Sequence, residues 1–156
     1  MYLKQGTIAP DFTAADSEGR TVSLSAYKGK KNVVLVINRG FFCFYTRRHM
    51  AQLRQDYPQF VARNAEVITI GPEDVKAFVE WWHNEKMPFP GIADPEHVIA
   101  KMYGQKVNLL KMGRMPALAV IDKEAKIRFM HYGSSMSDIP QDEDIFALLD
   151  ELNKKT

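Results

Sequence analysis

The sequence predicts an α/β domain in which a mixed central sheet is flanked by helices and preceded by an N-terminal β-hairpin. Two runs rich in β-branched residues, 33–37 and 67–70, have the composition of strands covered on both faces, and each is followed by helical spacing. Two later strands, 117–121 and 126–132, are joined by a tight turn at 122–125. A parallel start followed by a hairpin gives a mixed sheet with helices on both faces.

The first half of the chain supplies a hairpin, a strand and a long helix. Residues 12–24 predict two short strands around a turn at 17–20. After the strand at 33–37, apolar residues recur at helical spacing, so a helix is expected to begin just after Cys43. Pro58 lies inside this pattern and is expected to kink the helix or to end its first part. The apolar positions of this helix are Met50, Leu53, Tyr57 and Phe60 or Val61.

The second half alternates helices and strands. Acidic residues at 73–74 open a helix after the strand at 67–70, and a short helix has Pro95 in its first turn and Gly104 past its end. A last helix is expected from about 142 to 152. The expected inward positions of the first and last of these helices are Val75, Phe78, Val79 and Trp82, and Ile145, Leu148, Leu149 and Leu152. This order of elements is that of the thioredoxin-like fold.

Composition and charge exclude several kinds of partner. A chain of 156 residues predicts one domain, 1–156, that buries a core without disulfides or metals. With 21 Lys and Arg against 19 Asp and Glu, the net charge of +2 gives no field that would attract nucleic acid. The apolar runs are too short to cross a membrane, and the first residues lack the apolar stretch of a secretory signal. We therefore expect no nucleic-acid or membrane partner and a cytoplasmic location.

The single cysteine, Cys43, is the residue that we expect to carry the chemistry. It lies at the predicted strand-to-helix turn, where free backbone N–H groups and the helix dipole stabilise an anion. Arg39, Arg47, Arg48 and His49 add up to four cationic groups nearby. Such surroundings lower the pKa of a thiol, and the thiolate is the form that attacks peroxides and disulfides. The alternative interpretation is a small buried hydrophobe among aromatic neighbours.

Other polar and aromatic residues leave alternatives open. Thr46 could donate a hydrogen bond to the cysteine sulfur, because residues three apart share a helix face, or bond back to a backbone carbonyl. An exposed Trp81 beside Phe41 and Phe42 is a candidate surface for self-association as a homodimer. The four histidines show no metal-ligand spacing, and one cysteine cannot anchor a zinc site. Neither a metal nor a cofactor is predicted near His49, His83, His97 or His131.

Short motifs spread over nearly the whole chain occur in the order typical of one known family. They are residues 6–12, 22–24 and 27–30 before the first central strand, 89–95 and 103–104 in the middle, and 115–122 at the late hairpin. In this order they resemble the peroxiredoxins of the alkyl hydroperoxide reductase and thiol-specific antioxidant group. The resemblance implies the thioredoxin-like fold already expected from the order of elements.

The stretch around the cysteine resembles one branch of this family and departs from another. Residues 39–46, Arg-Gly-Phe-Phe-Cys-Phe-Tyr-Thr, are similar to the Arg-Gly-x-Trp-Cys-Pro-x-Cys of peroxiredoxin-like proteins, with Thr46 at the second cysteine position. Peroxiredoxins proper carry a Pro and a Thr where this chain has Val36 and Gly40. Their active-site Arg corresponds to Pro116 of this chain.

The resemblance implies a thiol-dependent oxidoreductase that reduces hydroperoxides or disulfides through one cysteine. The implied catalytic residues are Cys43, Arg39 and Thr46. The implied substrate-binding residues are Gly40, Phe42, Met115 and Pro116, with Pro116 in a cis peptide. Without a second cysteine, an external thiol of the glutathione or thioredoxin type must restore the protein. Two alternatives stay open: a one-thiol disulfide exchange protein, and a thioredoxin-fold binding module without catalysis.

Overall fold

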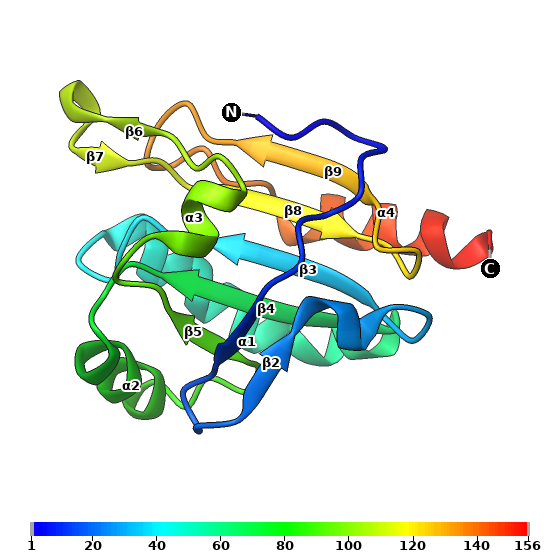
Figure 1. Cartoon of the computed structure of the whole chain (residues 1–156), viewed down its shortest axis with the longest axis horizontal. Helices are drawn as coiled ribbons and strands as arrows, with labels where there is room; N and C mark the ends of the chain where they lie inside the picture. Colours follow the sequence, from blue (N-terminus) through cyan, green and yellow to red (C-terminus); the bar gives the residue numbers. More distant parts are fainter. Residues whose placement is uncertain (1, 156) are drawn as a thin grey trace.

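The computed structural model describes residues 2–155 and is built around a five-stranded sheet of order β5-β4-β3-β8-β9 (Figure 1). The central strand β3 (Asn32–Ile37) is buried along its whole length. It pairs in parallel with β4 (Ala65–Gly71) and antiparallel with β8 (Ala117–Ile121). At the edges, β5 (Gly91–Ala93) runs parallel to β4, and β9 (Ile127–Tyr132) runs antiparallel to β8. The predicted mixed sheet is confirmed, although β5 was not expected from the sequence.

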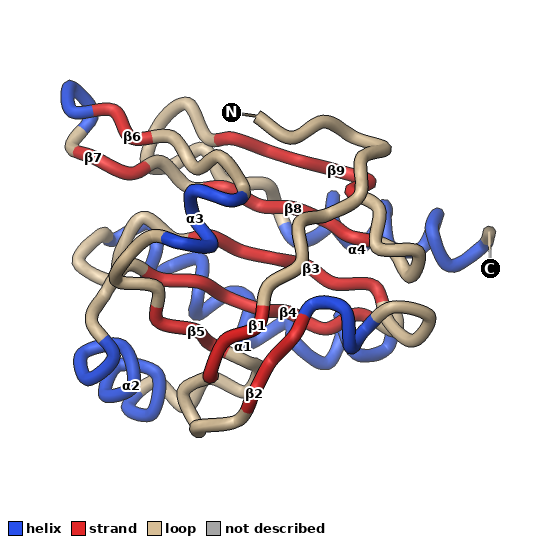
Figure 2. The backbone as a smooth tube through the Cα atoms, in the orientation of Figure 1, coloured by secondary structure: helices blue, strands red, loops and turns tan. Residues whose placement is uncertain are grey.

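Three helices pack on one face of the sheet. They are α1 (Phe44–Ala62), α2 (Val75–Asn84) and α4 (Asp142–Lys154), which lie behind or beside the strands in Figure 2. Val34 and Val36 of β3 belong to the core on this side, as the two-residue period of a strand requires. This core sets α1 against the sheet and so fixes the direction in which its first turn points.

The opposite face is covered by thinner elements. The predicted N-terminal hairpin is confirmed as β1 (Thr13–Ala15) and β2 (Thr21–Ser23), followed by the 3-10 turn η1 (Leu24–Tyr27). Together with α3 (Val98–Met102), this hairpin covers Val33, Leu35 and Ile37, the residues of β3 whose side chains point to this face (Figure 1). The sheet is therefore buried on both sides, which explains the continuous apolar run of its central strand.

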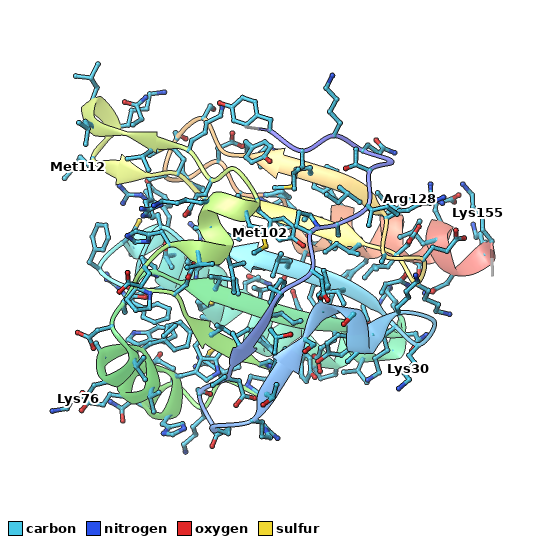
Figure 3. All side chains as sticks on the ribbon, in the orientation of Figure 1. Lys30, Lys76, Met102, Met112, Arg128 and Lys155 are labelled. Carbon is cyan, nitrogen blue, oxygen red and sulfur yellow. The ribbon has the colours of Figure 1, made fainter. Side chains whose placement is uncertain are left out.

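A second small hairpin, absent from the sequence-based expectation, extends from the sheet. It consists of β6 (Val107–Asn108), the 3-10 turn η2 (Leu109–Lys111) and β7 (Gly113–Arg114). Figure 3 labels Met112 at its outer end, well away from the central strands. Each of its strands has only two residues, which is too short for an alternating pattern that would predict a strand.

Three helix predictions need correction in detail. Helix α1 begins after Cys43 as predicted but continues through the exposed Pro58, at the cost of one helical hydrogen bond because proline has no N–H to donate. Val75 was expected on the buried face of α2 but is 61% exposed, because it is the first residue of that helix. The short helix starts at Val98 and not at Pro95, since the left-handed conformation of His97 interrupts it. No helix within residues 2–155 is both long and apolar enough to span a membrane.

Candidate active site

Cys43 is the N-cap residue of α1 and lies six residues after Ile37, the last residue of β3. Its backbone is extended, its N–H donates to the carbonyl of Gly40 at 3.2 Å, and its own carbonyl accepts from the N–H of Arg47 at 3.1 Å. The residue is 5% exposed. Its side chain therefore lies at the end of α1 where backbone N–H groups have no helical acceptor.

Hydrogen bonds to the Cys43 sulfur determine the direction in which its pKa moves. Burial alone acts to raise the pKa of the thiol. The backbone N–H of Thr46, the guanidinium of Arg39, the backbone N–H of Tyr45 and the hydroxyl of Thr46 all act to lower it, and together they outweigh burial. The net pKa lies below the ordinary value of a cysteine because these donors favour the anion. The first turn of α1 thus favours a thiolate.

Arg39 lies in the loop between β3 and α1 and is 4% exposed. Its Nε donates to the carbonyl of Arg114 at 2.9 Å, and its Nη2 donates to the carbonyl of Met112 at 2.9 Å. The guanidinium also lies 5.1 Å from the centroid of the Phe42 ring. Among residues 2–155 no carboxylate forms an ion pair with it. Its charge is stabilised by these carbonyls and by the Phe42 ring, and its hydrogen bond to the Cys43 sulfur acts to lower the pKa of that thiol.

The loop before the cysteine is held by Glu73, which sequence reasoning placed only at a helix start. Glu73 Oε2 accepts from the N–H of Phe41 at 2.7 Å, and burial raises the pKa of this carboxyl. Gly40 has φ of 141°, and a Cβ there would lie 2.6 Å from the ring of Phe42. Phe41 stacks on Trp81 with ring centroids 3.9 Å apart, so Trp81 is only partly exposed. Because β3 and β4 are parallel, the loops that follow them lie at the same edge of the sheet. The parallel order could therefore have indicated that Glu73, after β4, lies near the cysteine loop after β3.

The profile of the AhpC/TSA family matches residues 5–130, which include every element from β1 to β8. This chain belongs to the AhpC/TSA family. The chloroplastic peroxiredoxin Q of Oryza sativa subsp. japonica is 30% identical over 131 residues, and the match covers 83% of this chain but only 59% of the rice protein. The alkyl hydroperoxide reductase E of Mycobacterium bovis is 30% identical over 134 residues, covering 81% of this chain and 84% of that one.

A solved structure gives the same result for the fold of this AhpC/TSA chain. The peroxidoxin BcpB from Mycobacterium tuberculosis superposes with a TM-score of 0.84 at 21% identity, covering 97% of this chain and 99% of that one. The thioredoxin-like fold expected from the order of elements is therefore confirmed.

The structure of this AhpC/TSA protein places the predicted site residues in two different settings. Cys43, Arg39 and Thr46 meet at the start of α1, where Thr46 is 3% exposed. Phe42 is 66% exposed beside them. Met115 is instead a core residue, 2% exposed, whose N–H donates to the carbonyl of Lys106 and whose carbonyl accepts from Gln105. Its side chain is not presented to a substrate at the surface.

Pro116 lies near the site but not in the predicted conformation. Residues 2–155 contain no cis peptide bond, so the prediction of a cis bond before Pro116 is wrong. The trans form is favoured by about 0.5–1 kcal/mol even before proline, and the bond from the Met115 N–H to Lys106 keeps this segment extended along the second hairpin. Pro116 nevertheless lines a small hollow together with Thr46 and His49.

The four cations expected around the cysteine act differently from one another. His49 is buried, and loss of solvation lowers its pKa to about 4, so it is neutral at pH 7. Arg47 donates from Nη1 to the carbonyls of Phe41 and Phe42, each at 2.9 Å. Arg48 is exposed at the edge of a separate cleft. Only Arg39 contacts the sulfur directly.

Within residues 2–155, no three His, Cys, Asp or Glu side chains are grouped closely enough to hold a metal ion.

The lowered pKa of Cys43 predicts an alkylation profile shifted toward acid. Thiolate persists below the pH at which an ordinary cysteine becomes protonated, because the donors at the start of α1 favour the charged form. We expect the rate of iodoacetamide labelling, measured against pH, to have its midpoint below that of the same protein unfolded in urea. A folded midpoint at or above the unfolded one would contradict the proposed sulfur environment.

Proposed function

We propose that this AhpC/TSA protein is a thiol-dependent peroxidase in which Cys43 reduces a hydroperoxide and an external thiol restores the cysteine. The observation that carries the proposal is the convergence of two backbone N–H groups, the Thr46 hydroxyl and the Arg39 guanidinium on one sulfur. Membership of the AhpC/TSA family and the likeness to peroxiredoxin Q and alkyl hydroperoxide reductase E support it.

In the first step the thiolate of Cys43 attacks the terminal oxygen of the hydroperoxide. The S–O bond forms as the O–O bond breaks, so the sulfur is oxidised to sulfenic acid and the peroxide is reduced to an alkoxide, which takes up a proton to leave as the alcohol. Negative charge moves from the sulfur toward the peroxide oxygens during this step. Arg39 is the fixed donor available to that charge, because its guanidinium is already held against the sulfur by Arg114 and Met112.

This role for Arg39 compensates for residues that the chain lacks. Pro116 stands where peroxiredoxins carry their active-site Arg, and Gly40 stands where they carry a Thr. Arg114, two residues before Pro116, contributes its backbone carbonyl to Arg39, while its own guanidinium donates to Gln105 at 3.3 Å. We therefore assign the guanidinium of the reaction to Arg39.

The second step needs an external thiol, since the chain carries one cysteine. A first thiol attacks the sulfenic sulfur, which releases water and leaves a mixed disulfide with Cys43. A second thiol attacks this disulfide, which releases the oxidised external disulfide and returns Cys43 as a thiol. A reductant of the glutathione or thioredoxin type supplies both thiols. Because Cys43 is 5% exposed, the substrate and the reductant must each present a slender reacting group.

A one-thiol disulfide exchange protein is the second candidate. The observation that favours it is Thr46, which occupies the second position of a Cys-x-x-Cys turn and bonds to the sulfur through both its N–H and its hydroxyl. The same thiolate would attack a disulfide in place of a peroxide. A binding module without catalysis is disfavoured, because it gives no reason for a pKa of Cys43 below the ordinary value.

Peroxide consumed per Cys43 under excess thiol separates these functions. We expect many equivalents of hydroperoxide to be consumed with glutathione or a thioredoxin system, and a dimedone adduct on Cys43 when the thiol is withheld. Cys43→Ser abolishes both, because its hydroxyl is not a comparable nucleophile. Disulfide exchange without peroxide consumption would favour the second candidate. The absence of both reactions, with Cys43 unmodified, would overturn the proposal of an enzyme.

A further inference from the structure

The second hairpin ends in an apolar tip that no other part of residues 2–155 covers. The side chains of Leu109, Leu110 and Met112 are 88%, 97% and 72% exposed. They belong to η2 and the residue that follows it, at the end of the hairpin that projects beyond the sheet in Figure 1. Large apolar side chains exposed together mark an interaction site, whereas single ones scattered over a surface need no explanation. None of the steps proposed at Cys43 uses these side chains.

The tip is a defined turn that is held away from the body of the protein. The side chain of Asn108 accepts from the N–H of Leu110 at 3.0 Å and so closes the turn. At the base of the hairpin, Arg39 donates to two carbonyls of the returning strand, each at 2.9 Å. Lys111 Nζ donates to the carbonyl of Ser134 at 2.6 Å. These bonds fix the direction of the hairpin and keep its leucines in contact with solvent.

The hairpin and the helix before it carry positive charge without a matching negative charge. Between residues 97 and 121 the chain has no Asp or Glu, but it has Lys101, Lys106, Lys111 and Arg114. Within residues 2–155, none of these four cations forms an ion pair with a carboxylate. The net charge of +2 averages over the whole chain and hides this segment. The expectation of no membrane partner depended on that average.

Exposed leucines next to lysines match a partner that is apolar inside and anionic at its surface. Lys111 lies in η2 between Leu110 and Met112, and Lys106 directly precedes β6. Lysine side chains lay their apolar stems along apolar groups while the ammonium stays in a polar layer. Each lysine close to an anionic lipid surface strengthens binding to it. A bilayer that contains acidic lipids offers both the apolar interior and the anionic layer.

The shape of the tip favours a bilayer over a protein partner. The turn η2 has three residues and the strands that carry it have two each, so the tip is narrow and convex. A stable protein interface buries about 800 Å² on each partner, which requires a broader surface. Lipid surrounds an inserted side chain on all sides, so both leucines leave water almost completely.

The charge of the tip disfavours a second copy of this chain as its partner. A two-fold interface brings the same surface of both copies together. Such an interface through the tip would place Lys106 and Lys111 of one copy against the same lysines of the other. Anionic headgroups attract these lysines, whereas a second tip repels them.

We propose that the second hairpin is a membrane-docking element. Its tip, Leu109 and Leu110, inserts into the interface of a bilayer that contains anionic lipids, and Lys106 and Lys111 contact the headgroups. The inference goes beyond the proposed function and does not rest on it, because none of these side chains takes part in the reaction. The hairpin also holds Arg39 through its carbonyls, so docking places the cysteine site next to the element that contacts lipid.

Co-sedimentation with vesicles measures this binding directly. The full chain is mixed with vesicles of equal parts phosphatidylglycerol and phosphatidylcholine, and separately with vesicles of phosphatidylcholine alone. We expect saturable binding to the anionic vesicles that weakens as salt is added, and much weaker binding to the neutral ones. Binding to neither kind of vesicle, or equal binding to both, would overturn the proposal.

Substitution of the leucines tests the apolar part of the tip. Leu109→Ser combined with Leu110→Ser should weaken binding to the anionic vesicles by about tenfold or more, because two apolar side chains no longer enter the lipid. The matched control combines Val61→Ser and Val75→Ser, on α1 and α2, where the valines are 51% and 61% exposed. The control should bind like the parent protein. Equal effects of the two double substitutions would contradict a role of the tip.

Substitution of the lysines tests the charged part. Lys106→Gln and Lys111→Gln should each weaken binding by about fivefold, the usual contribution of one cation near an anionic surface. Lys30→Gln removes the same charge far from the hairpin, as Figure 3 shows by the labels of Lys30 and Met112. It should have little effect. If all three substitutions weaken binding equally, the binding reflects overall charge and not docking through the hairpin.

A fluorescent label tests whether the tip itself enters the lipid. Because Cys43 is the only cysteine in the sequence, Cys43→Ser combined with Leu110→Cys allows an NBD group to be attached at the tip alone. On addition of anionic vesicles we expect a blue shift of its emission and quenching by spin-labelled lipid. The same label at position 75, from Cys43→Ser with Val75→Cys, should show neither change. Equal responses at the two positions would overturn insertion of the tip.

Sedimentation of the parent protein without lipid distinguishes the remaining partners. If vesicles are not bound and the leucine substitutions convert a dimer into a monomer, the tip is an interface between copies and the proposal is wrong. If vesicles are not bound and the protein is a monomer, the proposal is also wrong, and a protein partner is left for the tip. Peroxide consumption without vesicles should be equal in the parent and the leucine variant. Vesicle binding without peroxide consumption would leave the docking element standing while the proposed peroxidase function fails.

Discussion

Replacing Arg39 with methionine should slow oxidation of Cys43 by hydroperoxide by about 10²–10³-fold, the effect typical of losing one fixed donor to developing negative charge. Methionine keeps much of the length of the side chain but removes the guanidinium that contacts the sulfur. It also removes the bonds to the carbonyls of Met112 and Arg114. The rate is measured from single-turnover peroxide consumption, and the alkylation profile of the same variant should move to higher pH.

Arg47→Met is the matched control for this prediction. Arg47 is equally close in sequence and bonds to the carbonyls of Phe41 and Phe42, but it makes no contact with the sulfur that affects the pKa of Cys43. Its loss should leave the alkylation midpoint in place and slow oxidation far less than the loss of Arg39. If the Arg39 variant reacts at the parent rate with an unchanged midpoint, the catalytic role assigned to Arg39 is wrong.

The free energy of unfolding should fall by about 3 kcal/mol between pH 7 and pH 4 because of His49 alone, at 1.36 kcal/mol per pKa unit. The pKa of His49 falls from 6.5 to about 4 in the folded protein because burial disfavours the imidazolium. The unfolded chain therefore binds a proton at a higher pH than the folded one. This contribution is complete above about pH 6.5 and is lost as the pH falls through 4.

Urea unfolding of the parent and of His49→Gln at pH 7 and pH 4.5 measures this effect. The glutamine does not titrate, so its variant should lose less stability on acidification. Asp142 contributes in the opposite direction, because its raised pKa means stability that is present at low pH and lost toward pH 8, but both proteins carry it. His83→Gln is the control, since His83 is half exposed and pairs with Glu18. An acid response of His49→Gln equal to that of the parent would contradict a buried neutral histidine.

The sequence alone determined the elements that contain long periodic or continuous patterns. The apolar run of β3 and the helical spacing after Cys43 placed the cysteine at the start of α1, and the structure agrees. The spacing of apolar side chains is set by the local backbone conformation, so a strand or helix of five or more residues can be recognised in the sequence. The second hairpin and β5 are too short for any period and went unpredicted, whereas the equally short β1 and β2 were found from the turn between them.

Only the tertiary structure decided which groups act on the sulfur. Arg39 could equally have been a solvated loop residue, and it is the carbonyls of the second hairpin, more than 70 positions away, that bury it against Cys43. His49 looked like one cation among four, yet packing under the segment before α4 makes it neutral. Period shows which face of an element is buried but not which neighbour covers it. Charge state depends on that neighbour, because burial and hydrogen bonds, and not residue type, set a pKa.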